Sequence, residues 1–310
     1  MHEDTNTQGT ILLQPGTLLD RAIATTKHAL NCGALVTIPT EYQFVEQQGV
    51  RFLVRTAVNL NRKDEAKQKQ ERQTATTGKD FNPFLPYDEN LYVADISDTH
   101  VCLLNKFNVV DCHLLLITRA FEEQETLLTL ADFTAMWVCL AELDGLTFYN
   151  GGKTAGASQR HKHLQIVPLP LTPANFPSIP LEPLLITANR GVVEVLPSLP
   201  FAHAFVQLDP IQIRSPQLAA TVTLNYYYQM LDRVGLKHDV SLNNIQAGAY
   251  NLLVTRQWML LIPRSQESFE SIAINSLGFA GTMFVRSDRQ MQILKEWGPM
   301  SVLSQVAILR

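Results

Sequence analysis

Apolar residues recur at helical spacing between Thr17 and Asn31, and Gly33 stands where such a helix would end. The same spacing predicts a long helix from Glu122 to Tyr149, and a third helix is expected around Pro216–Val234. Short apolar runs, several of them with alternating polar positions, predict strands. The predicted strands cover residues 37–45, 51–58, 91–96, 100–105, 109–118, 161–168, 250–254 and 258–262.

Two segments lack either periodicity and divide the chain. Asn59–Asp80 is rich in Lys and Arg and nearly devoid of large apolar residues, which is typical of a solvated linker or surface helix. A mobile flap over a polyphosphate is the alternative interpretation. Leu169–Leu185 contains five prolines and can be neither a helix nor a central strand. We place a boundary there, between residues 1–185 and residues 186–310, and a diverged duplication stays open because both halves contain strands and a helix.

The composition favours a globular protein and disfavours two classes of partner. Hydrophobic residues make up 46% of the 310 residues and charged residues 17%, which suits a packed core. The net charge of -4 disfavours a general nucleic-acid binder. Neither a targeting pattern nor an apolar run of about 18 residues is present, so we expect a soluble cytoplasmic protein with no membrane partner. The four cysteines form no C-x-x-C pair and are expected to be reduced thiols.

The candidate chemistry is concentrated in one predicted strand. Side chains alternate along a strand, so His161, His163 and Gln165 share one face, while Lys162 and Leu164 face the other way. A neutral imidazole is a good nucleophile toward phosphorus near pH 7. The neutral amide of Gln165 could bind a phosphoryl oxygen or the attacked bridging oxygen. Three polar groups on one face of an otherwise apolar strand therefore indicate a site.

A glycine-rich loop, Asn150–Gln159, leads directly into this strand. Its glycines let the backbone approach a ligand closely and point successive N–H groups at an anion, so the loop and the histidines together predict a phosphate site. A P-loop is rejected because Thr147 stands at the position of its first glycine and because the predicted order is helix, loop, strand.

A metal site through the two histidines is a minor alternative, since no nearby Cys or His pair completes it. Ordinary core histidines are the other alternative, and the loop and Gln165 argue against it. Five further histidines lack such polar company and are taken as structural: His28, His100, His113, His203 and His238.

These residues and several more segments closely resemble the diadenosine tetraphosphate phosphorylases (ATP adenylyltransferases) of the histidine-triad and galactose-1-phosphate uridylyltransferase superfamily. The segments are 105–107, 113–119, 149–152, 155–159, 161–165, 251–253, 258–259, 263–264 and 275–281. The resemblance implies an α+β, histidine-triad-like fold with a mostly antiparallel sheet, packed helices and two related halves in one chain.

The resemblance also implies a reaction and its residues. His163 would attack an α-phosphorus of diadenosine tetraphosphate, expel ATP and leave an AMP-histidine, which inorganic phosphate would convert to ADP. His161 would hold the geometry of His163, and Gln165 would bind an α-phosphoryl oxygen. The substrate-binding residues would be Asn105, Lys106, Asn150, Gly151, Gly152, Gly156, Ala157, Ser158, Gln159, Asn275 and Ser276. No metal site or tightly bound cofactor is implied, and Mg²⁺ would be the cation to accompany the polyphosphate.

Gln165 cannot donate a proton as an acid, which suits transfer to an ionised phosphate rather than hydrolysis.

Two alternatives to the phosphorylase stay open. The same loop and histidines could serve a related nucleotidyltransferase that acts on a nucleotide sugar or adenosine phosphosulfate. A non-catalytic nucleotide-binding sensor is the other alternative, and it predicts that His163→Ala leaves function intact.

Overall fold

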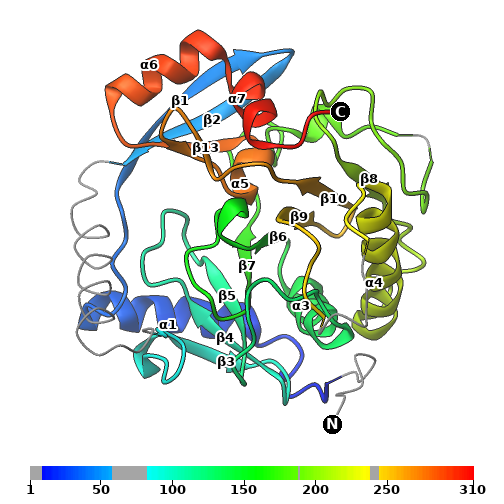
Figure 1. The fold of residues 1–310 in the computed structure, drawn as a ribbon. Coiled ribbons are helices and arrows are strands. Elements are labelled where there is room, and N and C mark those ends of the chain that lie inside the picture. Colours follow the sequence, from blue (N-terminus) through cyan, green and yellow to red (C-terminus); the bar gives the residue numbers. More distant parts are fainter. Residues whose placement is uncertain (1–8, 58–81, 188, 238–243) are drawn as a thin grey trace.

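The computed structural model describes residues 9–57, 82–187, 189–237 and 244–310 of the chain (Figure 1). The helices are α1 (Leu18–Cys32), α3 (Leu130–Glu142), α4 (Pro216–Arg233), α5 (Ser276–Phe279), α6 (Asp288–Trp297) and α7 (Pro299–Val306). The strands are β1 (Thr40–Gln47), β2 (Val50–Ala57), β3 (Tyr92–Asp95), β4 (His100–Leu104), β5 (Leu114–Thr118), β6 (Gly145–Gly151), β7 (His163–Pro168), β8 (Ala204–Gln207), β9 (Tyr250–Val254), β10 (Trp258–Pro263), β11 (Ser268–Phe269), β12 (Ile272–Ala273) and β13 (Thr282–Val285). The predicted linker Asn59–Asp80 and His238 lie outside the described residues.

An eight-stranded sheet in the order β3-β4-β5-β7-β6-β9-β10-β8 forms the centre of the molecule. Every neighbouring pair in it is antiparallel. The junction between β6 and β9 joins strands from the two parts of the chain, with Asn150 opposite Asn251. The predicted α+β fold with a mostly antiparallel sheet is therefore confirmed.

A second, three-stranded sheet lies at the top of Figure 1 with α6 and α7. Its order is β1-β2-β13, and β13 pairs with β2 in parallel. The strands β1 and β2 belong to the N-terminal part of the chain and β13 to the C-terminal part. Each half therefore contributes strands to both sheets.

Alternate residues of the central strands point into two separate cores. On one face Leu164, Ile166 and Tyr149 pack with residues of α1, α3 and α4. On the opposite face Leu146 and Phe148 pack with residues of the small sheet and of α5, α6 and α7. The strands β6 and β7 are thus covered on both sides, which fixes their register firmly.

The predicted helix Glu122–Tyr149 is wrong at both ends. Thr129 caps α3 through a capping box in which the Thr129 hydroxyl accepts from the N–H of Asp132 and the Asp132 carboxylate accepts from the N–H of Thr129. The helix ends near Leu143, and residues 145–151 form β6, where Phe148 and Tyr149 favour a strand. The glycine-rich loop therefore connects strand β6 to strand β7. Because a P-loop leads from a strand into a helix, the element order still argues against one, as does Thr147.

The strand predicted at residues 109–118 is also too long. Cys112 has a φ of 51°, which is left-handed backbone that a strand cannot contain, and β5 begins only at Leu114. Residues 105–113 form the connection from β4 to β5. Among the described residues, no helix is long and apolar enough to cross a membrane.

Candidate active site

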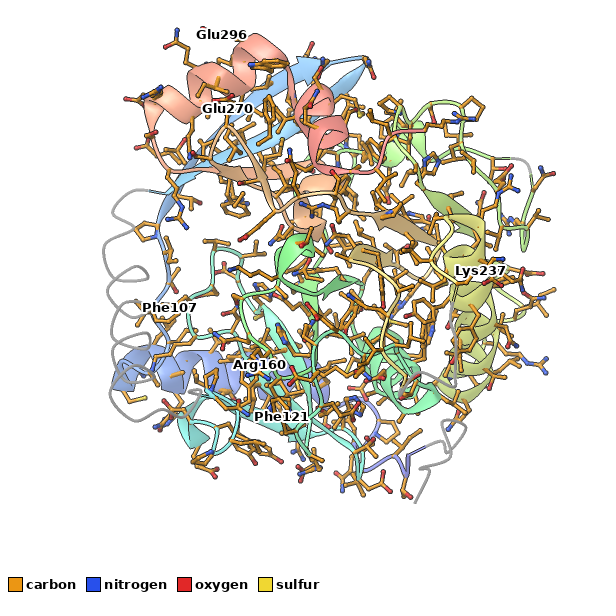
Figure 2. The ribbon with its side chains drawn as sticks, in the orientation of Figure 1. Phe107, Phe121, Arg160, Lys237, Glu270 and Glu296 are labelled. Carbon is orange, nitrogen blue, oxygen red and sulfur yellow. The ribbon has the colours of Figure 1, made fainter. Side chains whose placement is uncertain are left out.

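His163 and Gln165 lie on one face of β7, as the alternation predicts, and His161 lies just before that strand. The ring of Phe84 packs against both imidazoles, with centroids 5.7 Å from His161 and 5.4 Å from His163. Phe121, labelled in Figure 2, is 48% exposed, and its ring centroid lies 5.4 Å from that of His161. Aromatic side chains therefore pack against both histidines.

His163 is held in one tautomer by a main-chain contact. Its Nδ1 lies 2.8 Å from the carbonyl oxygen of His161, and because a carbonyl can only accept, Nδ1 carries the proton. The lone pair is then on Nε2. Burial, the largest cause, lowers the pKa of His163 to about 4, so the ring is neutral at physiological pH. This is the protonation state that a nucleophilic imidazole requires.

The ring of His161 is fixed by other contacts. Its Nε2 lies 2.8 Å from the carbonyl oxygen of Thr118 and so carries the proton, and its Nδ1 accepts from the side-chain amide of Asn82 at 3.0 Å. Burial lowers the pKa of His161 as well. His161 therefore orients His163 through its backbone carbonyl, while its own ring is anchored to Thr118 and Asn82.

Gln124 binds the backbone of His163, a contact that the sequence analysis did not predict. Its Oε1 accepts from the N–H of His163 at 2.9 Å, and its Nε2 donates to the carbonyl oxygens of His163 at 3.2 Å and Asn150 at 2.9 Å. Gln124 thereby links the start of β7 to the start of the glycine-rich loop. The predicted helix over this segment concealed the contact.

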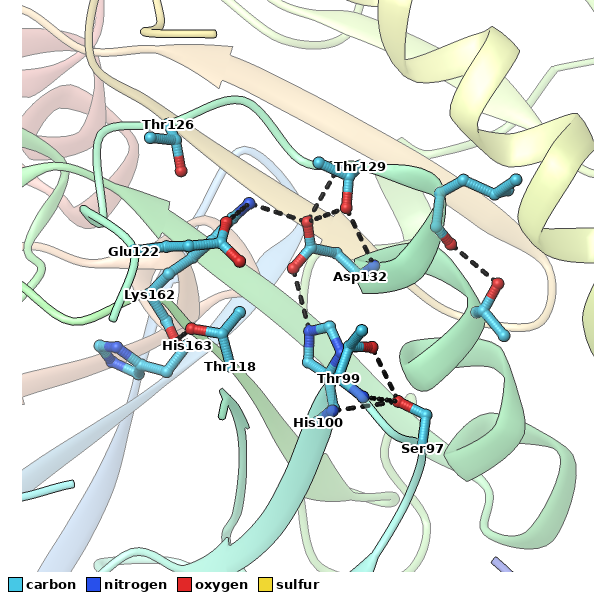
Figure 3. A network of polar contacts seen from close by, with 12 residues as sticks. Ser97, Thr99, His100, Thr118, Glu122, Thr126, Thr129, Asp132, Lys162 and His163 are labelled. Carbon is cyan, nitrogen blue, oxygen red and sulfur yellow. Dashed lines mark hydrogen bonds and ion pairs between the residues drawn. The ribbon is translucent and has the colours of Figure 1, made fainter. Parts of the chain in front are cut away.

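Lys162 points from the opposite face of the strand into a buried polar network (Figure 3). Its Nζ is fully enclosed and lies 2.8 Å from Asp132 Oδ2, 3.0 Å from Glu122 Oε2 and 3.0 Å from the carbonyl oxygen of Leu127. Nε2 of His100 also lies 3.0 Å from Oδ1 of Asp132. Each N–H of the ammonium group thus has an acceptor.

The opposite charges of this network shift the pKa values of their partners toward the charged forms. Burial alone would lower the pKa of Lys162, but the carboxylates of Asp132 and Glu122 raise it above its usual value. Burial alone would raise the pKa of Asp132, but Lys162 and His100 hold it well below its usual range. Both groups are therefore charged inside the protein.

Asn150 and Ser276 are brought together beneath the loop. Asn150 Oδ1 accepts from the N–H of Ser276 at 3.1 Å, lies 2.8 Å from its Oγ, and accepts from Asn251 Nδ2 at 2.9 Å. Arg264 then donates from Nη1 to Asn251 Oδ1 at 2.7 Å. The sequence analysis assigned no role to Asn251 or Arg264. The visible signal was a polar residue inside the apolar strand β9 and another directly after β10.

Gly156, another expected residue, packs directly against the residue that precedes α5. A Cβ on Gly156 would come within 2.8 Å of Asn275 Cβ, and its φ is +91°, so glycine is required by the packing of the loop on α5. Ser158 and Lys106 are exposed. Gln165 Oε1 lies 2.9 Å from Nε2 of His113, a histidine predicted to be a structural residue. Within the described part of the chain no cluster of His, Cys, Asp or Glu is arranged to hold a metal ion.

Two family models match the chain in succession. The Ap4A (diadenosine tetraphosphate) phosphorylase N-terminal domain matches residues 8–187, and the ATP adenylyltransferase C-terminal domain matches residues 197–309. The "Diadenosine 5',5'''-P1,P4-tetraphosphate phosphorylase 2" of Saccharomyces cerevisiae is 29% identical over 241 residues, which span 69% of this chain and 72% of that protein. "Protein APA1" of the same organism is 28% identical over 209 residues, 63% of this chain and 64% of that protein.

Solved structures give the same likeness over nearly the whole fold. The crystal structure of yeast Ap4A phosphorylase Apa2 in complex with AMP covers 97% of this chain and 99% of its own, with a TM-score of 0.76 and 25% sequence identity. The structure of that protein in complex with Ap4A covers 96% of this chain and 99% of its own, with a TM-score of 0.75 and 23% identity.

Lys162→Met should destabilise the protein strongly. It leaves the buried carboxylate of Asp132 without its ammonium partner, and breaking a buried ion pair in this way costs about 3–5 kcal/mol. Chemical denaturation measures the loss. Lys27→Met is the matched control, because Lys27 is exposed on α1 and its replacement should change stability by about 0.5 kcal/mol or less. Equal stability of the two variants would contradict this account of the network.

Proposed function

Because the chain belongs to the Ap4A phosphorylase family, we propose that it is a nucleotidyltransferase that cleaves diadenosine tetraphosphate with inorganic phosphate to ATP and ADP. The observation that carries the chemistry is the contact between His163 Nδ1 and the His161 carbonyl oxygen. It fixes the proton on Nδ1 and leaves the lone pair on Nε2, as attack on phosphorus requires.

In the first step Nε2 of His163 forms a bond to the α-phosphorus, and the bond from that phosphorus to the oxygen of the leaving ATP breaks. The leaving group departs as an anion and needs no proton, which agrees with the neutral amide of Gln165 on this face. The positive charge that develops on the imidazole ring is stabilised by the His161 carbonyl oxygen at Nδ1. The product of this step is an AMP-histidine.

In the second step an oxygen of inorganic phosphate attacks the same phosphorus, and the bond to His163 breaks. ADP is released and the imidazole returns to its neutral form. We assign Gln165 to an α-phosphoryl oxygen and the exposed and half-buried loop residues Gly156, Ala157, Ser158 and Gln159 to the phosphates. The buried pair Asn150 and Ser276 would hold that loop in place, with Asn275 capping α5 beside it.

The charge beneath the loop supports an anionic ligand. The guanidinium of Arg264 is only 4% exposed, and burial lowers its pKa to about 10, so it remains a cation at neutral pH. It donates to Asn251 Oδ1 and to the carbonyl oxygen of Ala155 in the loop. None of the ion pairs found among the described residues includes it. A buried positive charge of this kind attracts polyphosphate.

Two expectations complete the proposal. Mg²⁺ would bind together with the polyphosphate and screen its negative charge. The two transfer steps themselves need no permanently bound cofactor. We also propose that the protein works in the cytoplasm, and its four free cysteines are compatible with such a reducing compartment.

Product analysis tests the function. With excess diadenosine tetraphosphate, wild-type protein should form ATP and ADP over repeated turnovers only when phosphate is present, and without phosphate it should release no more than one ATP per active site. His163→Ala should abolish both. His203→Ala is the matched control: its Nδ1 lies 2.7 Å from the carbonyl oxygen of Phe201, but its Nε2 accepts from the N–H of Leu196 at 2.8 Å, so it is a buried histidine with no available lone pair. That variant should keep the products.

Other product patterns would contradict the proposal. ATP and AMP without phosphate would make water the acceptor. No turnover by the folded wild type would exclude this substrate, and a panel with nucleotide sugars and adenosine phosphosulfate would then identify a related nucleotidyltransferase. Activity in His163→Ala would remove the nucleophile from the mechanism.

The first step should stay fast in mildly acidic solution. The pKa of His163 is lowered to about 4, so its ring remains neutral where an ordinary histidine, with a pKa of about 6.5, becomes protonated. The rate of ATP release without phosphate, measured by rapid quenching, should be level down to about pH 5 and fall toward pH 4. A midpoint at about pH 6.5 would show that the ring titrates normally.

The folded state must be checked at each pH in that experiment. The unfolded chain binds a proton at this histidine below about pH 6.5, whereas the folded chain resists it down to about pH 4. Protonation therefore favours unfolding as the pH falls through that window, and circular dichroism separates a loss of fold from a loss of nucleophile.

A further inference from the structure

A row of three polar side chains leads from the connection between β4 and β5 to the active site. Asn105 Nδ2 lies 3.3 Å from His113 Nδ1, and His113 Nε2 lies 2.9 Å from Gln165 Oε1. Asn105 and His113 are adjacent through the hairpin, since the N–H of Asn105 donates to the carbonyl oxygen of His113 at 2.8 Å. His113 is 5% exposed, so these contacts lie inside the protein.

The donor-to-acceptor direction of the hydrogen bonds in this row is set at Asn105, the residue farthest from the active site. The backbone N–H of Phe107 donates to Asn105 Oδ1 at 3.3 Å, and a backbone N–H can only donate. The other end of the Asn105 amide is therefore its NH₂ group, which donates to His113 Nδ1. A neutral histidine that accepts at Nδ1 carries its proton on Nε2, and that proton goes to Gln165 Oε1.

We propose that His113, oriented by Asn105, is a positioning residue that fixes the Gln165 amide so that its NH₂ group faces the substrate; this inference rests on the proposed function. Phosphoryl oxygens only accept hydrogen bonds, so a reversed amide would place one oxygen against another. An unrestrained glutamine could adopt either orientation. His113 thus selects the donor end of Gln165 before substrate arrives, which is the preorganisation that stabilises developing charge.

Two neighbours of this pair among the described residues are apolar and do not supply this selection. The ring of Phe148 lies with its centroid 6.0 Å from that of His113 and is apolar. Leu115, which pairs with Gln165 across β5 and β7, contributes only an apolar side chain. The imidazole of His113 therefore sets the orientation of the Gln165 amide.

The first test needs no substrate. The tautomer of His113 in the ligand-free wild-type protein is measured from long-range nitrogen–proton couplings in a nitrogen-15 NMR spectrum. A proton on Nε2 is expected. A neutral ring with its proton on Nδ1 would overturn the proposal, whether or not the protein proves to be a phosphorylase.

The second test uses two amide replacements of matched polarity. In His113→Gln the new amide nitrogen can occupy the position of Nε2 and donate to Gln165, whereas in His113→Asn the shorter side chain reaches Asn105 but not Gln165. His113→Asn should lower kcat for phosphorolysis about tenfold or more, as part of the 10²–10³ that loss of a preorganised donor costs. His113→Gln should recover most of that loss, with KM little changed in both.

The same pair is then measured in a Gln165→Ala background. If His113 acts through Gln165, the difference between the two replacements should vanish there, because the group that they orient is gone. Equal losses in both replacements, or the same difference in the Gln165→Ala background, would show a purely structural role. A folded wild type that lacks phosphorolysis would refute the proposed function, and the tautomer measurement alone would then decide the orientation of Gln165.

Discussion

The ammonium group of Lys162 is enclosed by protein, and a buried cation of this kind is tolerated only when each of its protons has an acceptor. The acceptors are the carboxylate of Asp132 at the start of α3 and two groups of the segment 122–128. That segment therefore runs beside the start of β7 instead of forming a helix, with a turn between Glu123 and Thr126. Gln124 lies within it and thereby reaches the backbone of His163. The charges on one face of the strand thus determine the geometry of the nucleophile on the other.

A second constraint joins the two parts of the chain beneath the glycine-rich loop. Asn150 in the N-terminal part accepts from both Ser276 and Asn251 in the C-terminal part, and Arg264 anchors Asn251 in turn. The pairing of β6 with β9 and of β2 with β13 adds continuous backbone contacts across the same division. The loop could not keep its shape if either part were absent, so the site belongs to the whole fold rather than to the half that contains His163.

The sequence predicted those features that depend on local periodicity. The alternation of β7 placed His163 and Gln165 on one face correctly, because a strand has a period of two regardless of its partners. The helix from Glu122 to Tyr149 failed because its apolar spacing does not reveal that Lys162 needs acceptors from that segment. The partners of the Asn150 side chain lie more than 100 residues away in the chain, and no local pattern could connect them. His113 was passed over for the same reason, since its contact with Gln165 exists only across two neighbouring strands.

Two histidines of this protein show what separates a nucleophile from a structural residue. His163 and His203 both place Nδ1 against the carbonyl oxygen of the residue two positions earlier, and burial lowers the pKa of both. The difference is at the other nitrogen. Nε2 of His203 accepts from the N–H of Leu196, whereas Nε2 of His163 lies on the face that Gln165 and Phe84 share. The H-x-H pattern therefore gains its chemistry from a carbonyl that fixes one nitrogen and from surroundings in which no described residue donates a hydrogen bond to the other.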